Sequence, residues 1–233
     1  MCNLVAENCL FISLFPYSNV FIYATILQVI MAPSPYDELN TLLTRYLEVW
    51  GSELSIDRLR ECLQSLSTEE VYQLLTTVRD EYKLTAIYIA AGRGHPEVIT
   101  CLLDSVTAEQ KYQLLMIQNV GGVTALHYAV FNGHAEAAMC IYNSVTTEQR
   151  YQLLTIQTDY GSTPLHWAAR KGHTKLITRI LDSVKPAQQI QLLDITNDSK
   201  TVLDVALQYN NQSTVDLIKQ YYQRDITSAD GKN

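Results

Sequence analysis

The stretch that decides the fold is residues 161–173, which read Gly-Ser-Thr-Pro-Leu-His-Trp-Ala-Ala-Arg-Lys-Gly-His. Thr163 is placed to cap a helix, and Pro164 takes the first helical position, where its missing N–H costs nothing. Nine residues after the threonine, Gly172 is placed to end that helix in a left-handed turn. The stretch therefore predicts one short helix with a defined start and a defined end.

The same pattern recurs along the chain. Equivalent threonines stand 39, 39 and 38 residues apart, at Thr85, Thr124, Thr163 and Thr201. The helix-ending position follows nine residues later in each copy, as Gly94, Gly133, Gly172 and Asn210. A second motif keeps the same period, as Tyr-Gln-Leu-Leu at 72–75, 112–115 and 151–154 and as Ile-Gln-Leu-Leu at 190–193. Four copies of two motifs predict one continuous array of repeated units.

Each unit is predicted to contain three helices. After the first helix, apolar residues at helical spacing mark a second one, in the first unit Val98, Ile99, Leu102 and Leu103. A short third helix is predicted at the capping-box spacings Ser67-x-x-Glu70, Thr107-x-x-Gln110 and Thr146-x-x-Gln149, and at Pro186 in the last copy. No unit can bury its apolar faces alone, so we expect neighbouring units to stack.

The motif in residues 161–173 resembles the ankyrin repeat, whose signature is Thr-Pro-Leu-His-x-Ala-Ala followed by Gly-His. The second unit keeps Leu126-His127, Ala129 and Gly133-His134, whereas the first has Tyr88 in place of the signature histidine. The fourth unit keeps least, as expected of a cap that faces water. The resemblance implies an all-α helical repeat solenoid. Ankyrin units run about 33 residues, so the longer period here accommodates the extra helix.

The resemblance suggests a division of the chain into four segments. The repeats occupy 67–222, and 32–66 is expected to be a degenerate N-terminal repeat or cap, in which two amphipathic runs flank Trp50 and Gly51. A polar tail is expected at 223–233. Residues 1–31 form a hydrophobic extension, and no charged residue occurs between Asn8 and Tyr36.

The hydrophobic extension leaves three interpretations open. Residues 10–31 are long enough to cross a bilayer as a helix, but Pro16 lies near the middle and no Lys or Arg precedes Arg45 to orient the segment. A cleaved signal is disfavoured because Glu7 stands where a basic residue is usual. The third interpretation is an extension that is poorly ordered or not translated, since Met31 opens a soluble-looking start.

Composition and motifs argue against several classes of function. The chain is 47% hydrophobic with a formal charge of −7, which is typical of a folded protein and unfavourable for nucleic-acid binding. Its five cysteines form no zinc or disulfide pattern, and three of them recur 39 residues apart at equivalent positions of successive second helices, at Cys62, Cys101 and Cys140. No catalytic motif is present. We therefore expect no enzymatic activity, no cofactor and no metal.

The recurring histidines, at 127, 134, 166 and 173, invite a metal-ligand interpretation. They lack acidic or thiolate partners at a fixed spacing. The resemblance implies that they hydrogen-bond to backbone in the turns between helices, and we expect that structural role.

Binding residues are implied by the resemblance, because ankyrin repeats hold partners along a concave face. That face is built from the turn before each threonine and from two variable positions before the helix end. Carried onto this chain, these positions are Glu81, Tyr82, Leu84, Arg93, Val120, Val123, Phe131, Asn132, Asp159, Tyr160, Ser162, Arg170, Lys171, Asn197, Asp198, Gln208 and Tyr209. Phe131 is either a binding residue or is covered by the added helix of a neighbouring unit.

The sequence thus predicts a non-enzymatic protein-binding module, an adaptor or scaffold that is monomeric, cytoplasmic and bound to another protein. One alternative is a scaffold anchored to a membrane by residues 10–31. Another is a regulatory or effector subunit that masks the site of a partner enzyme.

Overall fold

The computed structural model describes residues 34–48 and 55–230. Within these ranges all regular structure is helical, and the only strand-like pairing is an isolated bridge between Asn197 and Lys200. The predicted extension at 1–31 lies outside the described residues. No helix in the described ranges combines the length and the apolar character that a membrane span requires.

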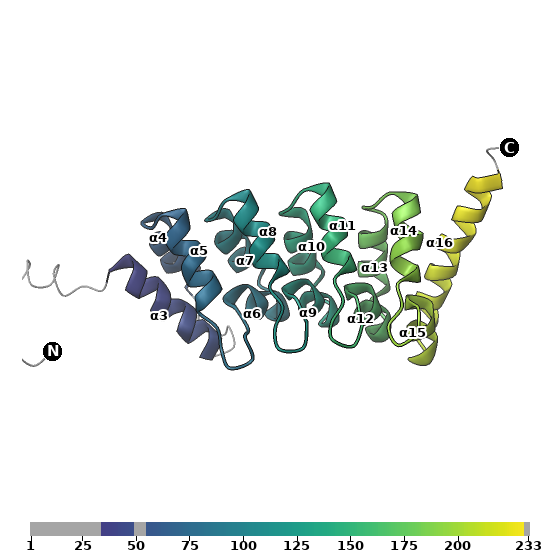
Figure 1. Cartoon of the computed structure of the whole chain (residues 1–233), viewed down its shortest axis with the longest axis horizontal. Helices are drawn as coiled ribbons and strands as arrows, with labels where there is room; N and C mark the ends of the chain where they lie inside the picture. The colour runs from purple at the N-terminus through teal and green to yellow at the C-terminus, as the bar shows by residue number, and fades with distance from the viewer. Residues whose placement is uncertain (1–33, 49–54, 231–233) are drawn as a thin grey trace, which may run out of the picture.

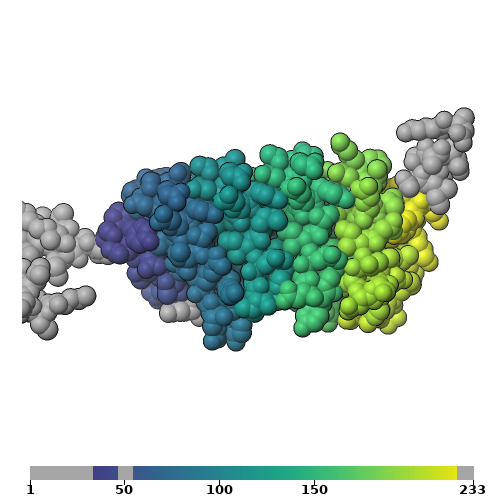
Figure 2. Space-filling view, viewed as in Figure 1, coloured from purple at the N-terminus to yellow at the C-terminus, as the bar shows by residue number. Residues whose placement is uncertain are grey.

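The chain is a stack of repeated helices that follow one another in sequence order along an elongated body (Figures 1 and 2). The first helices form one row, α6 (Ala86–Arg93), α9 (Ala125–Phe131), α12 (Pro164–Lys171) and α15 (Val202–Gln208). The second helices are α7 (Pro96–Asp104), α10 (Ala135–Asn143), α13 (Thr174–Leu181) and α16 (Gln212–Asp230). The predicted third helices are α8 (Ala108–Met116), α11 (Thr147–Thr155) and α14 (Pro186–Asp194). The all-α repeat solenoid is therefore confirmed.

Within the described residues, three further helices precede the first full unit. α3 (Pro35–Glu48) and α4 (Ile56–Gln64) pack against each other, and α5 (Thr68–Thr77) supplies the third-helix position. At the other end, α16 continues to Asp230, so residues 223–230, which were expected to form a polar tail, extend the second helix of the last unit.

The first helices begin and end at the predicted residues. Thr85 and Thr124 accept the backbone N–H three residues later, and Pro164 takes the first turn of α12. The helix-ending residues have positive φ, at Gly94, Gly133, Gly172 and Asn210. The alanines five positions after each threonine are completely buried, so neighbouring first helices pack closely there, at Ala90, Ala129, Ala168 and Ala206.

The third helices explain the Tyr-Gln-Leu-Leu motif. The leucine pairs are buried in every copy, and the tyrosine hydroxyl donates a hydrogen bond to the glutamine of the following unit. The three bonds measure 2.8, 2.8 and 3.1 Å, from Tyr72 to Gln113, from Tyr112 to Gln152 and from Tyr151 to Gln191. We call this series the Tyr–Gln ladder. It holds the third helices in register along the array.

Each helix-ending glycine also makes room for the next unit. Gly133 has a φ of 75°, and a Cβ atom placed there would lie 2.6 Å from the ring of His173 in the following unit. The same pairing recurs at the neighbouring junctions, between Gly94 and His134 and between Gly172 and Asn211. The Gly-His motif therefore acts between units: the glycine of one unit leaves space for a side chain of the next.

Candidate functional site

The loops before the first helices and the two residues directly before each helix-ending residue (Gly94, Gly133, Gly172 and Asn210) form the surface that we call the first-helix face. Its loops are residues 79–84, 118–123, 157–162 and 196–200. Five large apolar side chains are exposed among the described residues, and four of them lie on this face, with exposed fractions of 52, 56, 77 and 41% for Tyr82, Val120, Tyr160 and Tyr209. The fifth, Leu207, takes a position that is buried in the other units.

Side chains within each loop hold its backbone in one shape. The carboxylate oxygen Oδ1 of Asp80 accepts the backbone N–H groups of Tyr82 and Leu84 at 3.0 and 2.8 Å. In the next loop, Oδ1 of Asn119 accepts the N–H groups of Gly121 and Val123 at 2.9 and 3.0 Å. These are Asx-type turns, which order a loop without a strand ladder.

Neighbouring loops are also linked to one another. The N–H of Val120 donates to the carbonyl of Tyr82 at 3.4 Å, and the N–H of Asp159 donates to the carbonyl of Gly121 at 3.1 Å. The side-chain amides of two glutamines repeat this link, from Gln118 to the carbonyl of Gln157 and from Gln157 to the carbonyl of Thr196, at 3.2 and 3.0 Å. The loop tips are therefore fixed relative to one another before any partner arrives.

Most of the residues predicted to bind a partner are exposed on this face. They are Glu81, Tyr82, Arg93, Val120, Asn132, Asp159, Tyr160, Arg170, Lys171, Asp198, Gln208 and Tyr209, and Asn197 is half-buried. One part of this prediction is corrected. Leu84, Val123 and Ser162, each of which directly precedes the threonine of its unit, are buried. Leu84 and Val123 belong to the core, and the hydroxyl of Ser162 accepts a hydrogen bond from the Asn197 amide at 2.6 Å. That position is structural in these three units.

Phe131 is half-buried, and neither expected environment describes it fully. Its ring contacts Trp167 edge-on, with the ring centroids 5.1 Å apart, and Nζ of Lys171 lies 4.2 Å from its centroid. Both contacts come from α12, the first helix of the next unit, and not from an added third helix. Phe131 therefore supports a cation at the surface and exposes only part of its ring.

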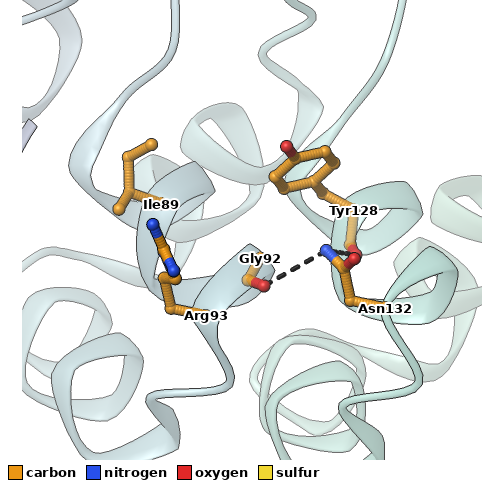
Figure 3. A pocket seen from close by; sticks show the side chains of 5 residues that line it. All are labelled: Ile89, Gly92, Arg93, Tyr128 and Asn132. Atoms are coloured by element: carbon orange, nitrogen blue, oxygen red, sulfur yellow. Dashed lines mark hydrogen bonds between the residues drawn. The ribbon is translucent and has the colours of Figure 1, made fainter. Parts of the chain in front are cut away.

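A first cleft lies between α6 and α9 (Figure 3). It has a volume of about 220 Å³ and is lined by Ile89, Gly92, Arg93, Tyr128 and Asn132. The amide of Asn132 donates to the carbonyls of Gly92 and Tyr128, both at 3.1 Å. A Cβ atom at Gly92 would overlap the Tyr128 ring, so this glycine makes room for the aromatic wall. Asn132 thus serves the junction as well as the surface.

A second cleft of about 130 Å³ lies between α12 and α15. The cleft is lined by residues of both the helices and the loops, namely Ser162, His166, Trp167, Arg170, Asn197, Asp198, Lys200, Val205, Gln208 and Tyr209. The loops and the first helices therefore form one continuous face here. The guanidinium carbon of Arg170 lies 5.0 Å from the ring centre of Tyr209. This cleft brings together six of the residues predicted from sequence to bind a partner: Ser162, Asn197 and Asp198 from the loops, and Arg170, Gln208 and Tyr209 from the ends of the first helices.

Sequence reasoning missed the walls of both clefts. Ile89 and Tyr128 line the first cleft, and Trp167 and Val205 line the second. All four stand four residues after a unit's threonine, at the variable position between the histidine and the first alanine of the motif. The sequence signal that could have identified these four residues is a position that varies between units while the positions on either side of it are repeated.

Comparison with known proteins agrees with this architecture. A family model described as ankyrin repeats (3 copies) matches residues 58–149 and 139–230, which together cover most of the chain. The chain belongs to the ankyrin-repeat family. Ankyrin repeats are generally protein–protein interaction modules. The search of curated proteins found no match for the chain.

The signature histidines of these ankyrin repeats are structural. Nδ1 of the buried His127 accepts the N–H of Thr124 at 3.3 Å, and Nε2 donates to the carbonyl of Ser162 in the next unit at 3.1 Å. Burial lowers the pKa of His127 to about 4, so the ring is neutral at pH 7. His166 bonds in the same way to Thr163 and Lys200, and burial lowers its pKa as well.

No cluster of metal-ligating side chains occurs in the described part of these ankyrin repeats. The recurring cysteines are free thiols, with Cys62 buried and Cys101 and Cys140 half-buried. Glu70 caps α5: its carboxylate accepts the N–H and the hydroxyl of Ser67 at 2.9 and 2.6 Å, and these bonds lower its pKa. The repeated polar residues of the ankyrin units are thus engaged in capping and in junctions.

Proposed function

We propose that the chain is a non-enzymatic adaptor or scaffold that binds a partner protein on its first-helix face. The observation that carries this proposal is the gathering of exposed apolar side chains there, at Tyr82, Val120, Tyr160 and Tyr209. Tyrosine is enriched at the energetic centres of protein interfaces. The general role of ankyrin repeats in protein–protein interaction supports the same conclusion.

The order of the loops supports this function energetically. A flexible loop loses conformational entropy when a partner immobilises it, and this loss weakens binding. Here the loop tips are tied internally by Asp80 and Asn119 and tied to each other through Gln118 and Gln157. The partner therefore meets a surface that is already arranged.

Affinity purification with quantitative mass spectrometry tests the proposal. The full chain is compared with the variant Tyr82→Ala/Val120→Ala/Tyr160→Ala, in which only exposed loop-tip side chains are shortened. A matched control, Glu97→Ala/Glu148→Ala/Lys175→Ala, shortens three exposed side chains on second and third helices. Far-ultraviolet circular dichroism checks that all three proteins have the same helix content.

We expect specific partners to be recovered with the full chain and with the control, and to be lost with the loop-tip variant. Recovery of the same proteins at the same level by the loop-tip variant would place the interaction elsewhere. A partner that is lost only with the control would assign binding to the second and third helices.

A further inference from the structure

Two adjacent cations at the end of α12 are held on aromatic rings of the helices to either side. Arg170 lies over the ring of Tyr209, the residue that follows α15, at 5.0 Å, and Lys171 lies over the Phe131 ring of α9 at 4.2 Å. Both side chains are exposed. A ring face attracts a cation by its quadrupole and leaves the outer side of the charge open to another ligand.

Neither cation has a carboxylate partner in the described part of the chain, whereas several cations on second and third helices do. Lys111 pairs with Asp104 at 2.9 Å, and Arg179 pairs with Glu136 at 2.7 Å. A position at a helix C-terminus favours positive charge through the helix dipole. The dipole does not explain why both charges are seated on aromatic rings beside a cleft.

The charge around the α12–α15 cleft is also positive. Arg170 and Lys200 line it against one carboxylate, Asp198, and a second carboxylate, Asp204, is near Lys200 but is hydrogen-bonded to Thr201. The Lys200 ammonium donates to the side chain of Gln208 at 2.8 Å. Lys171 adds a further positive charge at the adjoining edge of α12. The whole chain carries a formal charge of −7, so this local excess of cations has the opposite sign to the protein as a whole. An anionic segment would be repelled by most of the chain and attracted here.

We propose that the α12–α15 part of the first-helix face binds an acidic segment of the partner protein. Carboxylate side chains of that segment contact Arg170 and Lys171, and an apolar side chain beside them packs against Trp167 in the cleft. This inference rests on the proposed function and adds to it the chemical class of the partner. The planar guanidinium of Arg170 suits a carboxylate because it donates two parallel hydrogen bonds.

Selection from a random dodecapeptide library against the full chain tests the inference without knowledge of the partner. We expect the selected peptides to share Asp or Glu next to an apolar residue. The strongest peptide is then labelled and titrated by fluorescence anisotropy beside its counterpart with Asn and Gln in place of Asp and Glu. A hydrogen bond to a charged group is stronger than one to a neutral group, so we expect the amide peptide to bind about 10-fold or more weakly.

Variants of the protein assign the peptide to this site. Arg170→Glu/Lys171→Glu is expected to weaken binding by about 30-fold or more, and Arg170→Gln/Lys171→Gln, which only removes the charges, by about 10-fold. The control Lys175→Glu/Lys185→Glu changes the net charge as much as the first variant does, at two cations outside this face. We expect it to weaken binding less than about 3-fold, because distant surface charges are screened by salt.

A selection that yields no acidic consensus would overturn the inference. Equal binding by the chain and both Arg170/Lys171 variants would also overturn it, as would equal weakening by the Lys175/Lys185 control. Analytical ultracentrifugation tests for self-association. If the chain self-associates and Arg170→Glu/Lys171→Glu does not, the site binds a second copy of the chain and the acidic partner protein is rejected. Neutral peptides whose binding depends on Tyr82 and Tyr160 would leave the proposed function intact and reject only its acidic partner.

Discussion

The third helices and the first-helix face use the same repeat in opposite ways. On the third helices, the Tyr-Gln-Leu-Leu motif recurs with a single change, Ile190 in place of tyrosine, and the hydroxyls of the Tyr–Gln ladder contact the next unit. On the first-helix face, equivalent loop positions carry Tyr82, Gly121, Tyr160 and Asp198. In these two sets, the positions that repeat hold the units together, whereas the positions that vary lie at the loop tips. Substitutions at junctions should therefore reduce stability, and substitutions on the face should change binding alone.

The largest effect expected at a junction is a loss of stability in acid. The pKa of His127 is about 4 in the folded chain and about 6.5 when unfolded. Between these values the unfolded state binds a proton that the folded state does not, so stability is complete above pH 6.5 and falls toward pH 4. The difference corresponds to about 3 kcal/mol, and His166 contributes in the same direction.

Urea unfolding at pH 7.5 and pH 4 measures this loss. His127→Gln should be less stable than the parent chain at pH 7.5 but should lose less stability on acidification. If parent and variant lost the same free energy between the two pH values, the acid sensitivity would belong to other groups.

Gly133→Ala is expected to destabilise the chain by about 2–3 kcal/mol. The methyl group adds strain at a positive φ and also meets the His173 ring of the next unit. The matched control is Gly121→Ala, because a Cβ atom there meets no atom closer than 3.6 Å. Thermal unfolding followed by circular dichroism should show a clear drop in Tm for Gly133→Ala alone. Equal drops for both variants would contradict the pairing of glycine and histidine between units.

Removing one hydroxyl from the Tyr–Gln ladder should have a smaller effect. Tyr112→Phe deletes the bond to Gln152 and should cost about 0.5–1 kcal/mol, the net contribution of a single hydrogen bond near solvent. The triple variant with Tyr72→Phe and Tyr151→Phe should cost about the sum, since the three bonds lie at separate junctions. Denaturant unfolding checks both values. No measurable change in the triple variant would show that the leucine pairs alone hold the third helices in register.

On the face itself, Tyr160→Ala should change stability by less than about 0.5 kcal/mol, because the side chain is 77% exposed. Its effect should appear in partner binding instead. Thermal unfolding and a titration with a selected peptide, performed on the same preparation, separate the two. A large drop in Tm would mean that the loop tips contribute to stability, as the junctions between units do.

The fold was predictable because its signals are local and repeated. Thr163, Pro164 and Gly172 define one helix by capping, an allowed proline position and a left-handed turn, and the recurrence of that pattern identifies the array. The third helices followed from capping boxes such as Thr107 with Gln110, which the structure confirms. The family assignment is confirmed by the match over most of the chain.

The surface was less predictable because it depends on contacts between units. The position of Val123 and Ser162 in the repeat predicted that they bind a partner, but both side chains are buried and stabilise the loop instead. Phe131 lies against Trp167, which is 36 positions later in the sequence, and spacing within one unit contains no information on that contact. The cations of α12 were predicted as binding residues, but the rings that hold them became visible only with neighbouring units in place.

The pairing of glycine with histidine between units bears on how such a chain can lengthen. An internal unit carries both partners, as Gly133 accommodates His173 and His134 occupies the space beside Gly94. A tandem duplication of that segment would place each ring beside a glycine without any compensating substitution. With respect to this pairing, growth of the array by whole units therefore needs no compensating substitution at the new junction.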